Sequence, residues 1–383
     1  MRKPGKRGWI LLGVVLALIL LALALMLRPS APPPGPAPTQ TPTPVATPAP
    51  TTEPTPTSQP TPAPTATPAP LKAIVLELPV AASSGYASVA MKLRISPAPG
   101  AASTASLSAG APCRVLQESG GWFRVQTEGA EGWVESRYCL INLPDVIPSI
   151  VYDATNTYAS IIRASGAALP GITGHGLYPG KQQNDRLDAR QFIMPVLYPM
   201  AKKIYKAQRA ALSNSETLVI YEAYRPYDVQ MKVVRALEKL AAENETVRKG
   251  ITTSPWSLSW FASTRLSNHQ RGGAIDVSLA KVNATAQAVS GRYGYTVVTE
   301  SNRYKMPTAM HELSAAAAAF AVPVSARSRT AWRKAEPSRA MNAAALRLQR
   351  YCTDAGLTPL ASEWWHFNDL ETLENSGANP SSG

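Results

Sequence analysis

The order of hydrophobic and polar positions divides the chain into segments of different character. An uncharged apolar run covers residues 9–27, and a tract rich in proline and threonine follows it. Short stretches of alternating polar and apolar residues then give way to a mixture of helical and strand-like spacing. We therefore predict five segments: a basic flank with a transmembrane helix at 1–28, a linker at 29–71, a small β domain at 72–142, a larger domain at 143–372 and a disordered tail at 373–383.

The apolar run at residues 9–27 is long enough for a helix to cross about 30 Å of hydrocarbon. Basic residues precede it, so this end should stay in the cytoplasm and the rest of the chain should lie outside. We expect a retained anchor, and hence a single-pass protein of the cell membrane whose domains face the cell wall. A cleaved signal peptide stays open as the alternative. The proline-rich tract at 29–71 cannot bury a core and is expected to act as an extended spacer.

Alternating residues with turn residues between them predict short strands across residues 73–142. The pieces "LRISPAPG", "ESGGWFRV" and "GWVESRYC" resemble the bacterial SH3-like domain, a small all-β barrel. This resemblance implies a domain that binds a cell-wall polymer or serves as a spacer. Trp122 and Trp133 are candidates to line a ligand groove, and filling of the barrel core is the open alternative.

The larger domain mixes helices and strands. The spacing predicts helices within 189–212, 227–244 and 338–356, and strands within 217–224, 273–279 and 362–369. In "GAIDVSL", the aliphatic residues Ile275, Val277 and Leu279 alternate with Asp276, so its carboxylate should lie on the opposite face of the strand. Helices that are separate from a small antiparallel sheet are typical of an α+β domain.

Composition narrows the range of partners. The chain has 383 residues and a net charge of +13, part of which flanks the apolar run. The remaining charge forms no basic stripe with interleaved aromatic residues, so we expect no nucleic-acid partner. A positive protein outside the membrane suits an anionic wall polymer instead. The three cysteines, Cys113, Cys139 and Cys352, are too few for a metal cluster; either Cys113 pairs with Cys139 or all three are buried thiols.

Candidate chemistry lies in the second half of the chain. His269 and Asp276 are seven residues apart, and the pair Gly272 and Gly273 between them allows a tight turn that brings the two side chains together. A catalytic zinc site needs three protein ligands and an open position for water. Among the other histidines of the chain, His366 is the best placed third ligand, because a glutamate stands three residues before it.

That glutamate, Glu363, is the candidate general base of a hydrolytic zinc site. Positions three apart on a regular strand point to opposite faces, so Glu363 must occupy a turn or bulge if it is to face the same metal as His366. Arg225 follows a predicted buried strand and precedes a proline, which favours an extended conformation. Its guanidinium is a candidate to stabilise negative charge that develops on a peptide carbonyl.

Three segments of this domain carry a resemblance. "AYRP", "SNHQRGGAIDVSL" and "EWWHF" resemble, in this order, the motifs of the zinc D-alanyl-D-alanine dipeptidase and carboxypeptidase family, and the upstream "VYDATNTY" is similar to a further element of the dipeptidase branch. The resemblance implies a small α+β zinc-peptidase fold, shared with hedgehog-type domains, and one Zn2+ per chain. It also implies site roles: His269, Asp276 and His366 as zinc ligands, Glu363 as base, Arg225 as transition-state stabiliser and Ser267 as a substrate contact.

The sequence departs from the dipeptidase branch at "MPTAMHE". Where that branch carries an aspartate that helps to hold the free amino group of the substrate, this chain has His311 and Glu312. Either Glu312 substitutes for the aspartate, or a free amino terminus is not required. We expect a DD-carboxypeptidase acting on peptidoglycan stem peptides. A D-alanyl-D-alanine dipeptidase and a non-catalytic cell-wall-binding protein are the alternatives.

Overall fold

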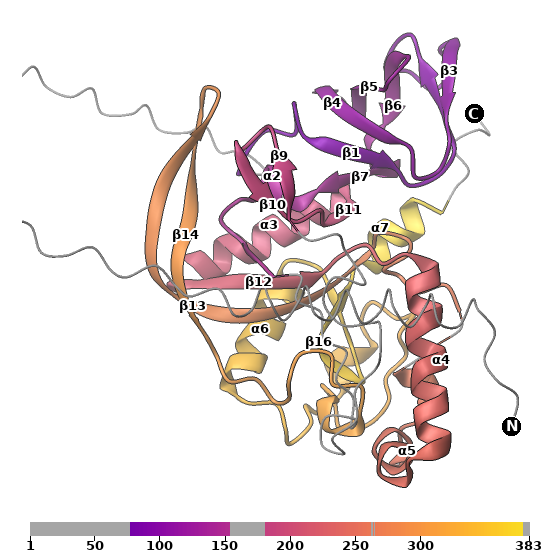
Figure 1. Ribbon diagram of the computed structural model, residues 1–383, viewed down its shortest axis with the longest axis vertical. Helices are drawn as coiled ribbons and strands as arrows, with labels where there is room; N and C mark the ends of the chain where they lie inside the picture. The colour runs from indigo at the N-terminus through magenta and orange to yellow at the C-terminus, as the bar shows by residue number, and fades with distance from the viewer. Residues whose placement is uncertain (1–76, 154–180, 262, 264, 378–383) are drawn as a thin grey trace, which may run out of the picture. The chain divides into compact units, whose positions relative to one another are not determined.

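The computed structural model describes residues 77–153, 181–261, 263 and 265–377 (Figure 1). Within these residues no helix has both the length and the apolar character needed to cross a membrane. The predicted transmembrane helix and linker at residues 1–71 lie outside the described residues, so the membrane anchor stays a prediction.

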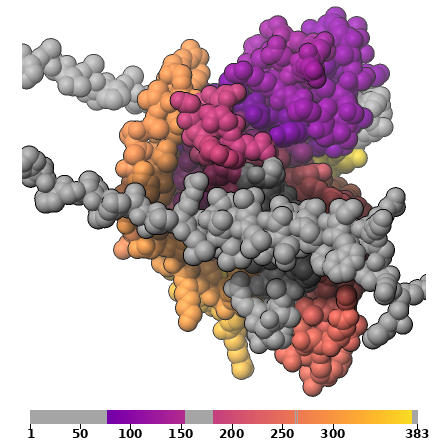
Figure 2. Space-filling view, viewed as in Figure 1, coloured from indigo at the N-terminus to yellow at the C-terminus, as the bar shows by residue number. Residues whose placement is uncertain are grey.

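The first part is an all-β region, as the SH3-like pattern predicts. Its seven strands pair antiparallel in one eight-stranded sheet of order β11-β7-β1-β4-β5-β6-β2-β3, whose eighth strand, β11 Pro195–Leu197, comes from the second part of the chain. Their side chains pack into one compact body, drawn in indigo and purple in Figure 2. The strands of this region are β1 Ser84–Ala87, β2 Met91–Arg94, β3 Ser103–Leu107, β4 Pro112–Ser119, β5 Trp122–Gln126, β6 Glu131–Glu135 and β7 Cys139–Asn142, with a short 3-10 helix η1 Ser136–Tyr138 before β7.

The structure bears on two alternatives that the sequence left open in this region, the place of two tryptophans and the state of the cysteines. Gly120 and Gly121 both have positive φ values, 53° and 86°, and form the two-residue turn between β4 and β5. Trp122, directly after this turn, is 9% exposed and Trp133 is half-buried, so the ligand groove and the barrel core stay open as alternatives for these two side chains. The three cysteines are free and buried, so Cys113 and Cys139 do not form a disulfide.

The second part is built on a mixed sheet. Its strand order is β15-β16-β13-β12-β8, with β14 paired to β13. The expected antiparallel arrangement holds for every pairing except that of β8 with β12, which is parallel. A separate two-stranded hairpin joins β9 to β10. The strands are β8 Val151–Tyr152, β9 Gln182–Asn184, β10 Ala189–Gln191, β11 Pro195–Leu197, β12 Glu216–Glu222, β13 Ala274–Ser290, β14 Tyr293–Arg303, β15 Thr358–Leu360 and β16 Glu363–Asn368.

Helices cover this sheet and contribute to its core. Helices α3 and α6 pack against each other and against strands β12 and β13 (Figure 1). On α3 the buried residues Met200, Ile204, Ala207 and Ala211 recur at helical spacing, which explains why this face lies on the sheet. The helices are α2 Leu143–Val146, α3 Tyr198–Leu212, α4 Tyr227–Glu243, α5 Glu245–Thr252, α6 Ala343–Asp354 and α7 Leu370–Asn375, with 3-10 turns η3 Leu258–Trp260, η4 Ala315–Ala317 and η5 Ala331–Lys334.

Helix α3 is shorter than the predicted helix at 189–212. It begins at Tyr198, and the residues before it form the short strands β10 and β11. Pro195 accounts for the difference, because proline lacks the amide hydrogen that a helix interior needs and disfavours helical geometry in the residue before it. Pro199, by contrast, lies in the first turn of α3, where proline is tolerated.

Strand β11 joins the two parts of the chain. It pairs with β7 at the edge of the SH3-like sheet, with Val196 opposite Ile141. Leu140 and Leu197, which lie opposite each other in this pairing, form a small buried group with Leu370 and Leu373, which we call the leucine cluster. The SH3-like region and the second part of the chain therefore share one sheet and a common apolar core.

The predicted disordered tail at 373–383 needs a correction at its start. Helix α7 extends to Asn375, and the side chain of Asp369 caps it by accepting a hydrogen bond from the Thr372 amide at 3.0 Å. Leu370 and Leu373 are buried in the leucine cluster, which holds this last helix in place. The sequence pattern missed it because six residues are too few to display helical spacing.

Candidate active site

A tight turn at residues 268–273 carries the first candidate ligand, His269. The amides of Gly272 and Gly273 donate hydrogen bonds to the carbonyl oxygens of His269 and Asn268, at 3.1 and 2.9 Å. Gly272 has a φ of 68°, a conformation that side chains rarely adopt. The turn that the two glycines predict is therefore present, and it directs the chain straight into strand β13.

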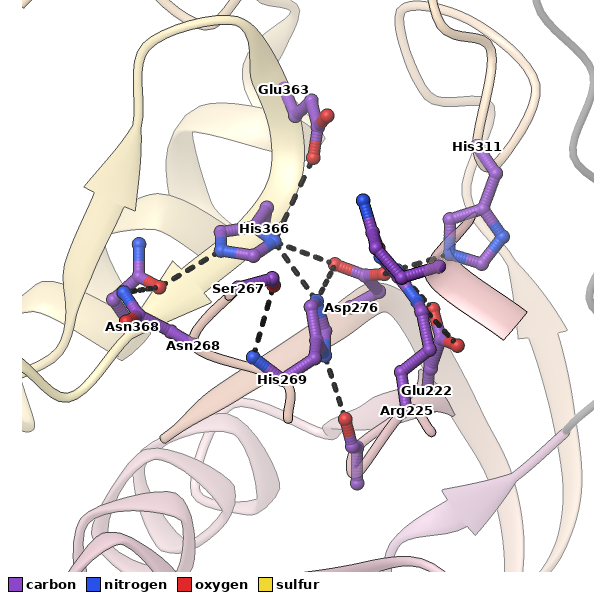
Figure 3. A network of polar contacts seen from close by, with 12 residues as sticks. Glu222, Arg225, Ser267, Asn268, His269, Asp276, His311, Glu363, His366 and Asn368 are labelled. Atoms are coloured by element: carbon purple, nitrogen blue, oxygen red, sulfur yellow. Dashed lines mark hydrogen bonds and ion pairs between the residues drawn. The ribbon is translucent and has the colours of Figure 1, made fainter. Parts of the chain in front are cut away.

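Strand β13 and strand β16 carry the other two candidate ligands. Asp276 on β13 lies directly opposite His366 on β16 in an antiparallel pair. The neighbours of Asp276 on β13, Ile275 and Val277, belong to the hydrophobic core. Since side chains alternate between the faces of a strand, the Asp276 carboxylate is left to face the two histidines, as the sequence predicts (Figure 3).

The three side chains converge on one point (Figure 3). His269 Nε2 lies 3.2 Å from His366 Nδ1, and Asp276 Oδ1 lies 3.4 Å from the first nitrogen and 3.1 Å from the second. A tetrahedral zinc site with bonds of about 2.1 Å has ligand atoms about 3.4 Å apart. Two imidazole nitrogens and one carboxylate oxygen at this spacing fit zinc and leave a fourth position for water.

The outer nitrogens of both imidazoles already have partners. His269 Nδ1 lies 2.6 Å from the Ala223 carbonyl oxygen, and His366 Nε2 lies 3.0 Å from Asn368 Oδ1. We assign the ring protons to these outer nitrogens, because both partners are acceptors. The lone pairs of His269 Nε2 and His366 Nδ1 then face the metal position, as zinc ligands require.

The charges of the site also suit a cation. Burial lowers the pKa of His269, which favours the neutral ring that binds a metal. Burial opposes the charged form of His366 too, but the hydrogen bond and charge of Asp276 outweigh it and raise the pKa of His366. Burial would raise the pKa of Asp276, yet His269 and the hydrogen bonds of three histidines hold it well below its usual range.

The second oxygen of Asp276 is held from the other side. Arg225 Nη2 donates to Asp276 Oδ2 at 3.2 Å, and His311 Nε2 lies 3.0 Å from the same oxygen. The Arg225 guanidinium in turn pairs with the fully buried Glu222, through Nε at 2.9 Å and through Nη2. This network fixes the orientation of Asp276, with Oδ1 toward the histidines and Oδ2 toward Arg225.

Glu363 lies at the start of β16, at the edge of the metal position. The pairing of β15 with β16 shifts from Pro359 opposite Phe367 to Leu360 opposite Glu363, so a bulge separates Glu363 from the rest of the strand. The bulge brings Glu363 Oε2 to within 3.7 Å of His366 Nδ1, as the expected turn or bulge requires. Burial raises the pKa of Glu363 to about 7, a value suited to accepting and returning a proton near neutral pH.

A cavity of about 830 Å³ opens over these residues, and the predicted substrate contacts differ in their relation to it. Ser267 lines the cavity, and its hydroxyl accepts a hydrogen bond from the His269 amide at 3.2 Å. His311 also lines it, although its ring is almost fully buried. Glu312 is not among the described residues of the cavity wall, and its carboxylate accepts a hydrogen bond from the Ser314 hydroxyl at 3.1 Å.

Sequence reasoning missed two residues that support the site, Glu222 and Asn368. Asn368 lies two residues after His366 on the same strand, and residues two apart share a face, which could have suggested it. Glu222 lies three residues before Arg225, at the end of a strand that reads as buried. A carboxylate in such a position needs a positive partner, and this could have pointed to Arg225.

Replacing Asn368 with alanine should weaken zinc binding about 10–100-fold, because groups that orient a ligand contribute that much to metal affinity. Asn368 Oδ1 accepts a hydrogen bond from His366 Nε2 at 3.0 Å and one from the side-chain amide of Asn268 at 2.8 Å. Asn368→Asp, which keeps the acceptor, should retain most of the affinity. Titration against a competing chelator measures both variants, and equal affinities for the alanine and aspartate variants would contradict this role.

Comparison with known proteins identifies two domains in this chain. Residues 87–138 match the model of the bacterial SH3 domain, and residues 188–377 match that of the D-Ala-D-Ala dipeptidase family, in the order that the motifs predict. A search of curated proteins finds no match. The second family is zinc-dependent, and the donor set of His269, Asp276 and His366 fits that metal. The catalytic region of this chain therefore belongs to the D-Ala-D-Ala dipeptidase family of zinc metallopeptidases and follows a bacterial SH3 domain.

Proposed function

We propose that this chain is a membrane-anchored zinc DD-carboxypeptidase that removes the terminal D-alanine from stem peptides of peptidoglycan. The observation that carries the choice of a stem peptide over a free dipeptide is the size of the cavity, about 830 Å³. Cavities of this size hold ligands much larger than two alanine residues. Apolar side chains on its wall, among them Trp260, Phe261 and Leu313, offer contacts for a longer peptide.

The position of His311 supports the same choice. In the dipeptidase branch that the sequence resembles, an aspartate at this place helps to hold the free amino group of the substrate. Here an imidazole occupies the place, and it contacts Asp276 Oδ2 at 3.0 Å between the rings of Tyr221 and Trp365. Since an imidazole cannot supply the negative charge of an aspartate, attraction for a free amino terminus is weaker, and a substrate that continues beyond this point is favoured.

Each residue of the site has its own role in the proposed reaction. Zinc, when bound by His269, Asp276 and His366, would polarise the scissile carbonyl and acidify a water molecule. Glu363 accepts a proton from the attacking water and returns it to the leaving amine of D-alanine. The guanidinium of Arg225, which lines the cavity, stabilises negative charge on the carbonyl oxygen as it develops.

The segments before the peptidase domain would place this activity at the cell wall. The segment at residues 9–27 would hold the protein in the membrane, and the proline-rich tract would carry its domains toward peptidoglycan. The SH3-like domain would add contacts to a wall polymer. These roles rest on the sequence pattern and on the match to the bacterial SH3 domain.

Product analysis tests the choice of substrate. The zinc-loaded protein would be offered D-alanyl-D-alanine and a stem pentapeptide that ends in D-alanyl-D-alanine, and mass spectrometry would follow both. We expect release of one D-alanine from the pentapeptide at least tenfold faster than cleavage of the dipeptide, which corresponds to about 1.4 kcal/mol of barrier. Cleavage of the dipeptide alone would instead assign a D-alanyl-D-alanine dipeptidase.

A further inference from the structure

Two exposed arginines, Arg265 and Arg327, stand on the wall of the same cavity that contains the metal ligands. We propose that they form a carboxylate-binding rim that makes the enzyme selective for anionic peptides. Arg265 lies in the segment before the His269 turn, and Arg327 lies between η4 and η5, so separate parts of the chain contribute the two arginines to one cavity wall. This proposal rests on the peptidase function proposed above and specifies its substrate.

Among the described residues, neither Arg265 nor Arg327 has an acidic partner, unlike two arginines close to them in space or in sequence. Arg225 is occupied by Glu222 and Asp276, and Arg329, two residues after Arg327, pairs with Glu371 at 2.9 Å. An arginine that lines a cavity and lacks an acidic partner presents a planar pair of donors, which matches a carboxylate in a bidentate contact. The cavity thus offers two such donors to a ligand.

The distribution of charge over the cavity indicates where a carboxylate would bind. At the buried end, Arg225 is neutralised by Asp276 and Glu222, and Glu363 stands at the metal position. Among the described residues of the wall, the exposed charged side chains are those of Arg265, Arg327 and Glu238 on α4. These three side chains carry an excess of one positive charge, which attracts an anionic peptide to the cavity before it reaches the metal position.

A peptide that a carboxypeptidase cleaves has a terminal carboxylate, and a stem peptide can carry a second one on an acidic residue upstream. Three forms of one D-alanyl-D-alanine peptide separate these sources: the peptide with both carboxylates, the same peptide amidated at its C-terminus, and the same peptide amidated at the upstream acidic residue. Steady-state kinetics would be measured for the zinc-loaded full chain with each form.

The variant that combines Arg265→Gln with Arg327→Gln should raise KM for the fully charged peptide about tenfold and leave kcat nearly unchanged, since the arginines contribute binding common to substrate and transition state. Amidation of the carboxylate that they bind should abolish this difference between variant and wild type. Higher salt should reduce it, because exposed charges are screened. Arg329→Gln, in the same loop but outside the cavity wall, is the matched control and should leave KM unchanged.

Glu238→Gln gives a test of opposite sign. It removes the negative charge of the rim, so KM for the fully charged peptide should fall by a few fold. If the double arginine variant changes KM equally for all three peptides, or changes it no more than Arg329→Gln does, the carboxylate-binding rim is wrong.

A binding measurement separates this proposal from the proposed function. Zinc-loaded Glu363→Gln, which should hold the peptide without cleaving it, would be titrated with the three peptides by calorimetry, with and without the two arginine substitutions. Charge-dependent binding that requires the arginines supports the rim even if the wild-type protein releases no D-alanine, in which case only the peptidase assignment fails. Binding that is independent of both arginines overturns the rim even if the enzyme is active.

Discussion

Glu363→Gln is expected to lower kcat about 10²–10⁴-fold, the range typical for loss of a general base or acid. Glu363 lies at the metal position with its carboxylate 3.7 Å from His366 Nδ1, and glutamine has nearly the same shape but cannot accept the proton. Burial raises the pKa of Glu363, which means that the folded protein disfavours the charged carboxylate. A neutral glutamine amide at this position should therefore not destabilise the metal-free protein. The thermal midpoint should therefore stay the same or rise.

The control for this experiment is Glu374→Gln. Glu374 lies on α7 and is largely exposed, and its carboxylate lies 3.8 Å from Arg329 Nη1, so its loss should change neither activity nor folding. Zinc content would be measured for both variants by elemental analysis. If Glu363→Gln retains a full complement of zinc and also most of its activity, another group takes the proton and the assigned role is wrong.

Leu140→Ala, a substitution in the SH3-like region, is expected to weaken zinc binding in the catalytic region. Leu140 belongs to the leucine cluster, and a Cβ placed on Gly272 would lie only 2.2 Å from Leu140 Cδ2. Leu140 therefore packs directly against the turn that carries His269, and Leu373 of the same cluster packs against Gly273. Truncation should cost about 2–5 kcal/mol of stability and loosen this turn.

Leu107→Ala is a closely matched control, because Leu107 on β3 has 6% exposure against 5% for Leu140. Strand β3 ends the sheet at the edge opposite β11. Both variants should lower the free energy of unfolding, measured in urea, whereas only Leu140→Ala should raise the zinc dissociation constant of the folded protein. An equal loss of zinc affinity in the two variants would show that overall stability, and not support of the turn, connects the two regions.

Features that depend on local sequence were predictable. The double glycine predicted the turn after His269, and the alternation in "GAIDVSL" placed Asp276 opposite the aliphatic side chains. The requirement that Glu363 and His366 face one metal predicted a bulge, which the pairing of β15 with β16 contains. In each case a few neighbouring residues determine the backbone or the face.

Features that depend on distant pairing were not predictable. The three residues of β11 were assigned to a helix, and their extended conformation depends on hydrogen bonds to β7, more than 50 positions earlier. The parallel pairing of β8 with β12 also joins residues that are far apart in the sequence. The loop that carries His311 and Glu312 has no periodic residue pattern, so its path could not be predicted. That path brings His311 into contact with Asp276 and leaves Glu312 outside the described cavity wall.

The shared sheet also restricts where the chain can be divided for production. A fragment that begins at residue 188, where the match to the peptidase family starts, would lack both β7, the partner of β11, and β8, the partner of β12. Two strands would then expose unpaired backbone groups, and such edges promote self-association. Recombinant versions of this protein should instead begin before β1, so that the SH3-like domain and the peptidase domain are expressed together.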